Sequence, residues 1–71
     1  MSIHDPYTAM YERGFAYGHS DVKTDTMVFT FKGEKFEFPT EKAFSVAHFN
    51  GYFYQAKIED LRRLEAEAAT G

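Results

Sequence analysis

Residues 26–38 read TMVFTFKGEKFEF and carry the clearest strand pattern in the chain. Large apolar residues alternate with polar ones at a period of two, which is typical of strands with one buried face. A glycine near the middle interrupts the alternation, so we expect an antiparallel hairpin with strands at about 26–32 and 35–38. A two-residue turn at Gly33-Glu34, with glycine in the first position, fits a type II′ turn.

This register would pair Phe31 with Phe36 and Phe29 with Phe38. All four rings would then stand on one face of the hairpin, where cross-strand aromatic pairs contribute up to about 1 kcal/mol each. A slip by one residue would move the rings of one strand to the other face, so we expect a well-specified register. A two-stranded hairpin alone is marginal in water, and other elements must cover its apolar face.

Before the hairpin, the sequence predicts a helix at about residues 5–18. Asp5 is a preferred N-cap, and Pro6 fits the first helical position because its missing N–H would have no partner there. Gly18 tolerates the left-handed conformation that ends many helices. Spacings of three and four residues connect the members of the expected buried stripe, which are Tyr7, Met10, Tyr11, Gly14 and Tyr17.

After the hairpin, the sequence predicts a C-terminal helix at about residues 40–68, continuous or else bent or broken at 50–51. Thr40 is a suitable N-cap. The expected stripe consists of Phe44, Ala47, Gly51, Tyr54, Ile58 and Leu61. In the alternative interpretation Asn50-Gly51 forms a turn, and residues 52–58, in which apolar residues alternate, form a third strand.

Both expected helices contain an interior glycine followed by an aromatic residue, Gly14 before Phe15 and Gly51 before Tyr52. A glycine in a helix interior costs about 1 kcal/mol relative to alanine, so two of them require a reason. We expect the helices to cross at Gly14 and Gly51, where neither has a Cβ atom. The alternative is that Asn50-Gly51 is a helix end and a turn.

These elements predict an α+β fold of α-β-β-α order in a single small domain, residues 1–71. The chain has eight Phe and five Tyr, which can supply a core, but no Cys to form a disulfide. Cysteine-free domains of this size depend on good packing, oligomerisation or a partner. Both strands of the expected hairpin are edges that could pair with another chain.

Charge and composition limit the class of protein. The net charge of −3 argues against a general nucleic-acid binder, which usually carries a basic surface. No apolar run approaches the length of a membrane span, and the N-terminus lacks the features of a signal peptide. We therefore expect a cytoplasmic protein.

No motif for catalysis, a cofactor or a metal is found. His4, His19 and His48 stand in separate elements without metal-ligand spacing, and a zinc site needs three or four suitable ligands. The carboxylates form no recognisable acid–base pair, and no nucleophile elbow or phosphate-binding loop is present. We expect no catalytic residue, no metal and no cofactor.

More aromatic residues are present than the expected core can bury. In a continuous C-terminal helix, Phe49, Tyr52 and Phe53 would share a patch at i, i+3 and i+4 beside the main stripe. Phe15 is also left outside the core. Because a contiguous exposed aromatic patch marks an interface, we expect these four residues to bind a partner.

The sequence therefore favours a non-enzymatic protein-binding module, an accessory or inhibitor-type protein of bacterial or phage origin. It would act as a dimer or on a larger basic target, such as a nucleic-acid-processing protein, because its own charge is negative. One alternative is a small nucleic-acid-binding or regulatory domain, with the hairpin phenylalanines as a stacking platform. A small enzyme is the other alternative.

Overall fold

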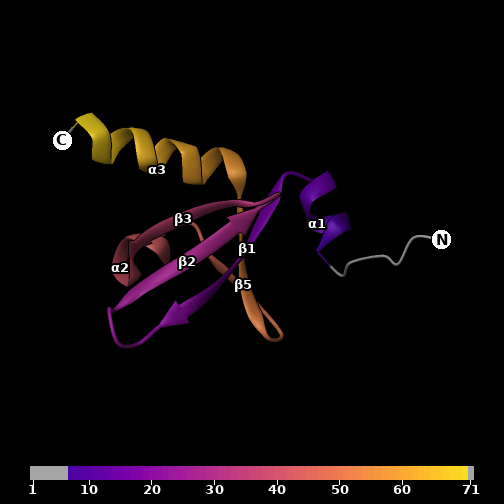
Figure 1. Cartoon of the computed structure of the whole chain (residues 1–71), viewed down its shortest axis with the longest axis horizontal. Coiled ribbons are helices and arrows are strands. Elements are labelled where there is room, and N and C mark those ends of the chain that lie inside the picture. The colour runs from indigo at the N-terminus through magenta and orange to yellow at the C-terminus, as the bar shows by residue number, and fades with distance from the viewer. Residues whose placement is uncertain (1–6, 71) are drawn as a thin grey trace.

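The computed structural model describes residues 7–70 and shows an α+β fold, with a five-stranded antiparallel sheet and three helices in this part of the chain (Figure 1). The α+β class is confirmed, but the expected two-stranded sheet is wrong. The strand order is β3-β2-β1-β5-β4. The elements in chain order are α1 (Thr8–Glu12), β1 (Phe15–Asp21), β2 (Thr26–Phe31), β3 (Glu34–Pro39), α2 (Thr40–Ala43), β4 (His48–Asn50), β5 (Phe53–Lys57) and α3 (Ile58–Thr70).

The hairpin of residues 26–38 is present as β2 and β3, but its turn lies one residue earlier than expected. The loop is Lys32-Gly33, and both residues have positive φ angles, 50° and 89°. Positive φ at both positions is the requirement of a type I′ turn, whose twist matches the flanking strands. Phe29 therefore faces Phe36, not Phe38. Because this shift changes the pairing by two residues, the hairpin rings keep the same face.

The expected helix at 5–18 is wrong beyond its first turns. Helix α1 ends at Glu12, and Gly14 adopts a φ of 82°, the left-handed conformation that stops helices. From Phe15 onward the burial alternates at a period of two, with Ala16 and Gly18 buried on one face. Asp5 and Pro6, the expected start of this helix, lie outside the described residues.

Gly18, expected to end the first helix, lies in the central strand β1 opposite Phe29 of β2. A Cβ atom at Gly18 would lie 2.5 Å from Cδ2 of the Phe29 ring. Because glycine has no Cβ atom, the Phe29 ring can pack directly over the backbone of β1. Phe29 is fully buried there.

The expected helix at 40–68 is also wrong. It is replaced by the short helix α2, the hairpin β4–β5 and the helix α3. The alternative of a strand at 52–58 is close to the observed β5. Strand β5 pairs with β1 and β4, and its pairing with β1 places Ala56 opposite Ala16. Pairing between such distant segments overrides the helical spacing of the sequence.

The expected crossing of helices at Gly14 and Gly51 does not occur. Gly14 lies between α1 and β1, and Gly51 lies in the β4–β5 turn with a φ of 67°. A Cβ atom at either position would have no neighbouring atom within 4 Å. Both glycines are required by the backbone conformation of a turn and not by close packing.

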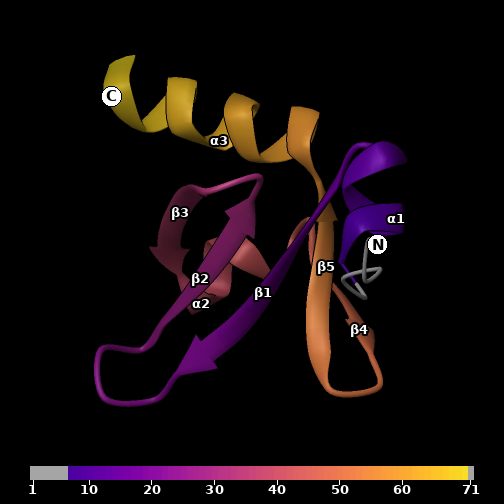
Figure 2. The same cartoon turned by 45° about the vertical axis from the view of Figure 1, so that its right-hand side comes forward.

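The core lies on one face of the sheet, which α2 and α3 cover (Figures 1 and 2). Helix α3 contributes Leu61 and Leu64 at a spacing of three, and α2 contributes Ala43. In Figure 2, β1 runs between the two hairpins. The buried core residues are Ala16, Met27, Phe29, Phe36, Phe38, Ala43, Val46, Ala56, Leu61 and Leu64. We call this side the core face.

Candidate protein-binding surface

Large apolar side chains are exposed mainly in one segment of the chain. Phe44, Phe49 and Tyr52 have exposed fractions of 53%, 67% and 98%. Val22, at 87%, is exposed in a turn between β1 and β2, in another part of the molecule. Scattered apolar residues on a surface are normal, whereas neighbouring ones require an explanation.

Phe44 and Phe49 are neighbours because both contact Tyr54. The ring of Phe44 lies 5.7 Å from that of Tyr54, and the ring of Phe49 lies 5.4 Å from it, both in edge-to-face geometry. Edge-to-face pairs at such distances are favourable arrangements of aromatic rings. Tyr54 in turn packs against the core. Phe44, Phe49 and Tyr54 together form what we call the β4-side aromatic surface.

This surface lies on the core face of the sheet, at the edge formed by β4. Phe49 faces Tyr54 across the β4–β5 pair, and Tyr54 faces Gly18 across the β5–β1 pair. Residues that face one another in antiparallel strands stand on the same side. Helix α2 ends at Ala43, and Phe44, the next residue, is half exposed, as Phe49 is on β4.

Tyr52 extends the aromatic residues to the tip of the β4–β5 hairpin. Its backbone N–H donates to the carbonyl oxygen of Asn50 at 2.7 Å, which tightens the turn around Gly51. Tyr52 is the most exposed of the large apolar side chains. A ring held at the end of a tight turn is well placed to reach into a partner.

The expected patch of Phe49, Tyr52 and Phe53 is divided by the sheet. Phe49 stands on the core face, whereas Phe53 stands on the opposite face and contacts the ring of Tyr17 at 6.1 Å. The helical spacing that would have joined them is absent, because these residues belong to two antiparallel strands. Phe15 is also half-buried on that opposite face.

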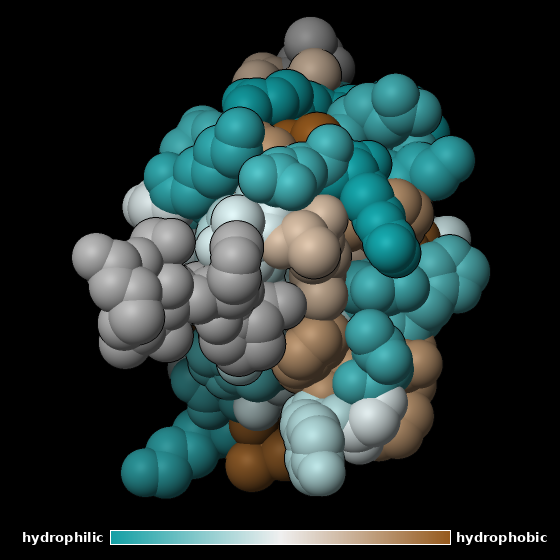
Figure 3. Space-filling model, turned by 90° about the vertical axis from the view of Figure 1, so that its right-hand side faces the viewer, coloured by the Kyte–Doolittle hydropathy of each residue, from teal (hydrophilic) through white to brown (hydrophobic). Residues whose placement is uncertain are grey.

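The opposite face carries a second group of rings, which holds α1 against the sheet. Tyr7 stacks on Tyr17 with 3.8 Å between ring centroids and 14° between planes, and Tyr7 also contacts Phe53 at 5.4 Å. Tyr11 contacts Tyr17 at 5.9 Å and, at the end of β2, also the ring of Phe31 at 5.5 Å, which itself packs against the core. Figure 3 views the molecule from the α1 side, where apolar side chains form a narrow strip between polar ones.

Three of the four hairpin phenylalanines are inaccessible to nucleic-acid bases, and the fourth, Phe31, is half-buried. Phe29, Phe36 and Phe38 have exposed fractions of 0%, 3% and 7%. A stacking platform needs rings that bases can reach, so these rings serve the core.

The histidines described by the structure lie apart from one another. His19 and His48 are exposed on different strands, and His4 lies outside the described residues. Within residues 7–70, no group of three or more His, Asp or Glu side chains is placed to hold a metal ion. None of the helices in that range has the length and apolar character needed to cross a membrane.

Comparisons with known proteins give no match: no protein-family model fits the chain, and no curated protein or solved structure is significantly similar to it. Any assignment of function therefore rests on the residues and the geometry described above.

Proposed function

We propose that this chain is a non-enzymatic protein-binding module that contacts its partner through the β4-side aromatic surface and Tyr52. The main support is that Phe44 and Phe49 are both exposed and both contact Tyr54 at an edge of the sheet. Tyrosine and phenylalanine are enriched at the centres of protein interfaces, where they bury large areas at low entropic cost. Residues of this kind are common hot spots of binding.

The partner is a larger protein with a basic surface, or a second copy of the chain. The net charge of −3 favours a basic partner, because complementary charge speeds encounter and orients the two surfaces. Two copies would carry charge of the same sign, but β4 itself has no Asp, Glu, Lys or Arg to oppose self-pairing. By covering a surface on a larger protein, the chain would act as an accessory or inhibitor.

The test compares the wild-type chain with the double variant Phe44→Asp and Phe49→Asp. Val22→Asp is the matched control, since it also introduces a carboxylate at an exposed apolar position, away from the proposed surface. Sedimentation velocity over a concentration series reports self-association. Affinity capture from the source cell, followed by mass spectrometry, reports other partners.

The proposal predicts that the wild type and Val22→Asp self-associate, or retain the same defined protein, and that the double variant does neither. A desolvated aromatic contact replaced by a charge costs at least about 2 kcal/mol, or roughly a thirtyfold loss of affinity. A wild type that stays monomeric and captures the same proteins as the double variant would refute the proposal.

A further inference from the structure

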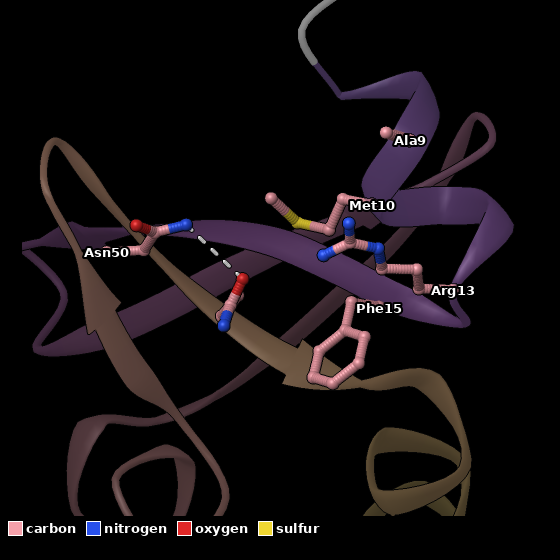
Figure 4. A pocket seen from close by; sticks show the side chains of 6 residues that line it. Ala9, Met10, Arg13, Phe15 and Asn50 are labelled. Carbon is pink, nitrogen blue, oxygen red and sulfur yellow. Dashed lines mark hydrogen bonds between the residues drawn. The ribbon is translucent and has the colours of Figure 1, made fainter.

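A pocket of about 240 Å³ lies on the face of the sheet opposite the core (Figure 4). It is formed where α1 meets β1 and the β4–β5 hairpin. The lining residues are Ala9, Met10, Arg13, Phe15, Asn50 and Gln55. In Figure 4 the side chains of Met10 and Arg13 extend from the α1 region in the direction of Asn50. The pocket therefore combines an apolar part with a cation and two carboxamides.

Arg13 is the one arginine of the chain that forms no ion pair within residues 7–70. Arg62 pairs with Glu34, and Arg63 pairs with Asp60 and Glu67. Glu12 is next to Arg13 in the chain and is exposed, yet it forms no ion pair with it. The planar guanidinium of Arg13 can thus offer its donors to a ligand, in the geometry that suits a carboxylate.

The two carboxamides form a hydrogen bond with each other. Asn50 donates from Nδ2 to Oε1 of Gln55 at 3.3 Å across the β4–β5 hairpin. The bond uses the oxygen of Gln55, so the Nε2 group of Gln55 keeps its two N–H donors. A second donor group therefore lies in the same pocket as Arg13.

Lys57 and His48 stand on the same face of the sheet as the pocket, and Lys57 adds a cation to that of Arg13, although the whole chain is acidic. Lys57 faces Phe15 across the β1–β5 pair, and His48 faces Gln55 across the β4–β5 pair. Facing residues of antiparallel strands stand on the same side, so both side chains rise beside the pocket. Neither forms an ion pair with the described residues. Arg13 and Lys57 can therefore attract an anion to this face in a chain of net charge −3, with Glu12 as the adjacent carboxylate in the sequence.

We propose that the pocket binds a carboxylate carried on a compact apolar group. The carboxylate would accept hydrogen bonds from Arg13 and from Nε2 of Gln55, and the apolar group would pack on Met10 and Phe15. The volume of about 240 Å³ is below the range of roughly 300–1,000 Å³ usual for drug-sized ligands, so the ligand is about the size of one amino-acid residue. Either the free C-terminus of a peptide or a small organic acid has this chemistry.

The experiment is an NMR titration of the ¹⁵N-labelled chain with N-acetyl-leucine. N-acetyl-leucinamide is the matched neutral probe, and inorganic phosphate is the anion without an apolar group. We expect saturable shifts at the amides of Arg13, Phe15, Asn50 and Gln55, with a Kd on the order of 1 mM for so small a ligand. The neutral amide and phosphate should each bind at least about tenfold more weakly, because each lacks one of the two groups.

Variants assign the contacts. Arg13→Gln should weaken binding of N-acetyl-leucine at least about fivefold, because it removes the guanidinium fork, and Arg13→Lys should fall between it and the wild type. Arg62→Gln is the control, since it removes an equal charge at a residue already paired with Glu34. A peptide ending in leucine that binds more tightly than N-acetyl-leucine would assign the ligand to a peptide C-terminus, and equal affinity would assign it to a small acid.

Three results would overturn the proposal. One is equal binding of N-acetyl-leucine and its amide, which would show that the carboxylate does not contribute to binding. Another is equal binding of phosphate and N-acetyl-leucine, which would show that the apolar group does not contribute. The last is an Arg13→Gln variant that binds as the wild type does. None of these results bears on the β4-side aromatic surface, which lies on the other face of the sheet.

Discussion

The two edge strands of the sheet differ in what they present to solvent. Strand β3 has six residues, exposes Glu34, Lys35 and Glu37, and ends in Pro39. Its phenylalanines are buried in the core. Strand β4 has three residues, all of them exposed, and none is a proline or carries a full charge at neutral pH.

Charged side chains and proline are the usual means by which proteins prevent edge strands from pairing with other chains. The β3 edge uses both, whereas the β4 edge uses neither and has exposed aromatic rings beside it. The three-residue length of β4 limits the backbone hydrogen bonds that a partner strand could form. Strand β4 is therefore the less protected edge, and the binding proposed for it would depend more on aromatic side chains than on strand pairing.

The largest expected difference is between a phenylalanine on each edge. Phe36→Ala on β3 should lower the free energy of unfolding by about 3–5 kcal/mol, because it leaves a cavity in the core. Phe49→Ala on β4 should lower it by less than about 0.5 kcal/mol, because the ring is mostly exposed. Urea denaturation at a concentration where the chain is monomeric measures both. Equal losses of unfolding free energy in the two variants would show that the two edges do not differ in how their phenylalanines are packed.

A smaller effect is expected at the central strand, which joins the two hairpins. In Gly18→Ala the new Cβ would lie 2.5 Å from the Phe29 ring, so the ring or the strand has to move. Overpacking of this kind costs about 1–3 kcal/mol, which thermal unfolding would detect as a lower Tm. An unchanged Tm would show that β1 and β2 do not pack as closely as described.

The smallest effect is expected at the ion pair that connects α3 with the β3 edge. Arg62 and Glu34 are 3.0 Å apart, but both side chains are about half exposed. Glu34→Gln should therefore change the free energy of unfolding by less than about 0.5 kcal/mol. A loss above about 1 kcal/mol in the same urea experiment would mean that the pair, and not buried packing, secures this edge.

The sequence predicts the β2–β3 hairpin because its signal is local. Met27, Phe29 and Phe31 recur at a period of two, as do Phe36 and Phe38, and the glycine at 33 lies in the turn. The other three strands carry weaker local signals. Ala16 and Gly18 look like helix residues until the Phe29 ring is known to fill the space above Gly18. Strand β5 exists because it pairs with β1, and no local pattern shows a partner so distant in the sequence.

The candidate surface was predictable only in part for the same reason. The count of rings leaves Phe49 and Tyr52 outside the expected core, and both are exposed. The sequence pattern predicts that Phe44 lies in the core as part of a long helix, but α2 ends at Ala43 and the ring is half exposed. Helical spacing groups Phe53 with Phe49, whereas the strand alternation puts them on opposite faces.

The most direct test of the β4 edge as the binding site is hydrogen–deuterium exchange of the chain, alone and in its complex. The complex is the one that affinity capture isolates, or the self-associated form found by sedimentation. We expect residues 44–54 to gain protection in the complex and residues 34–39 to gain none. Protection gained at 34–39, with none at 44–54, would contradict it.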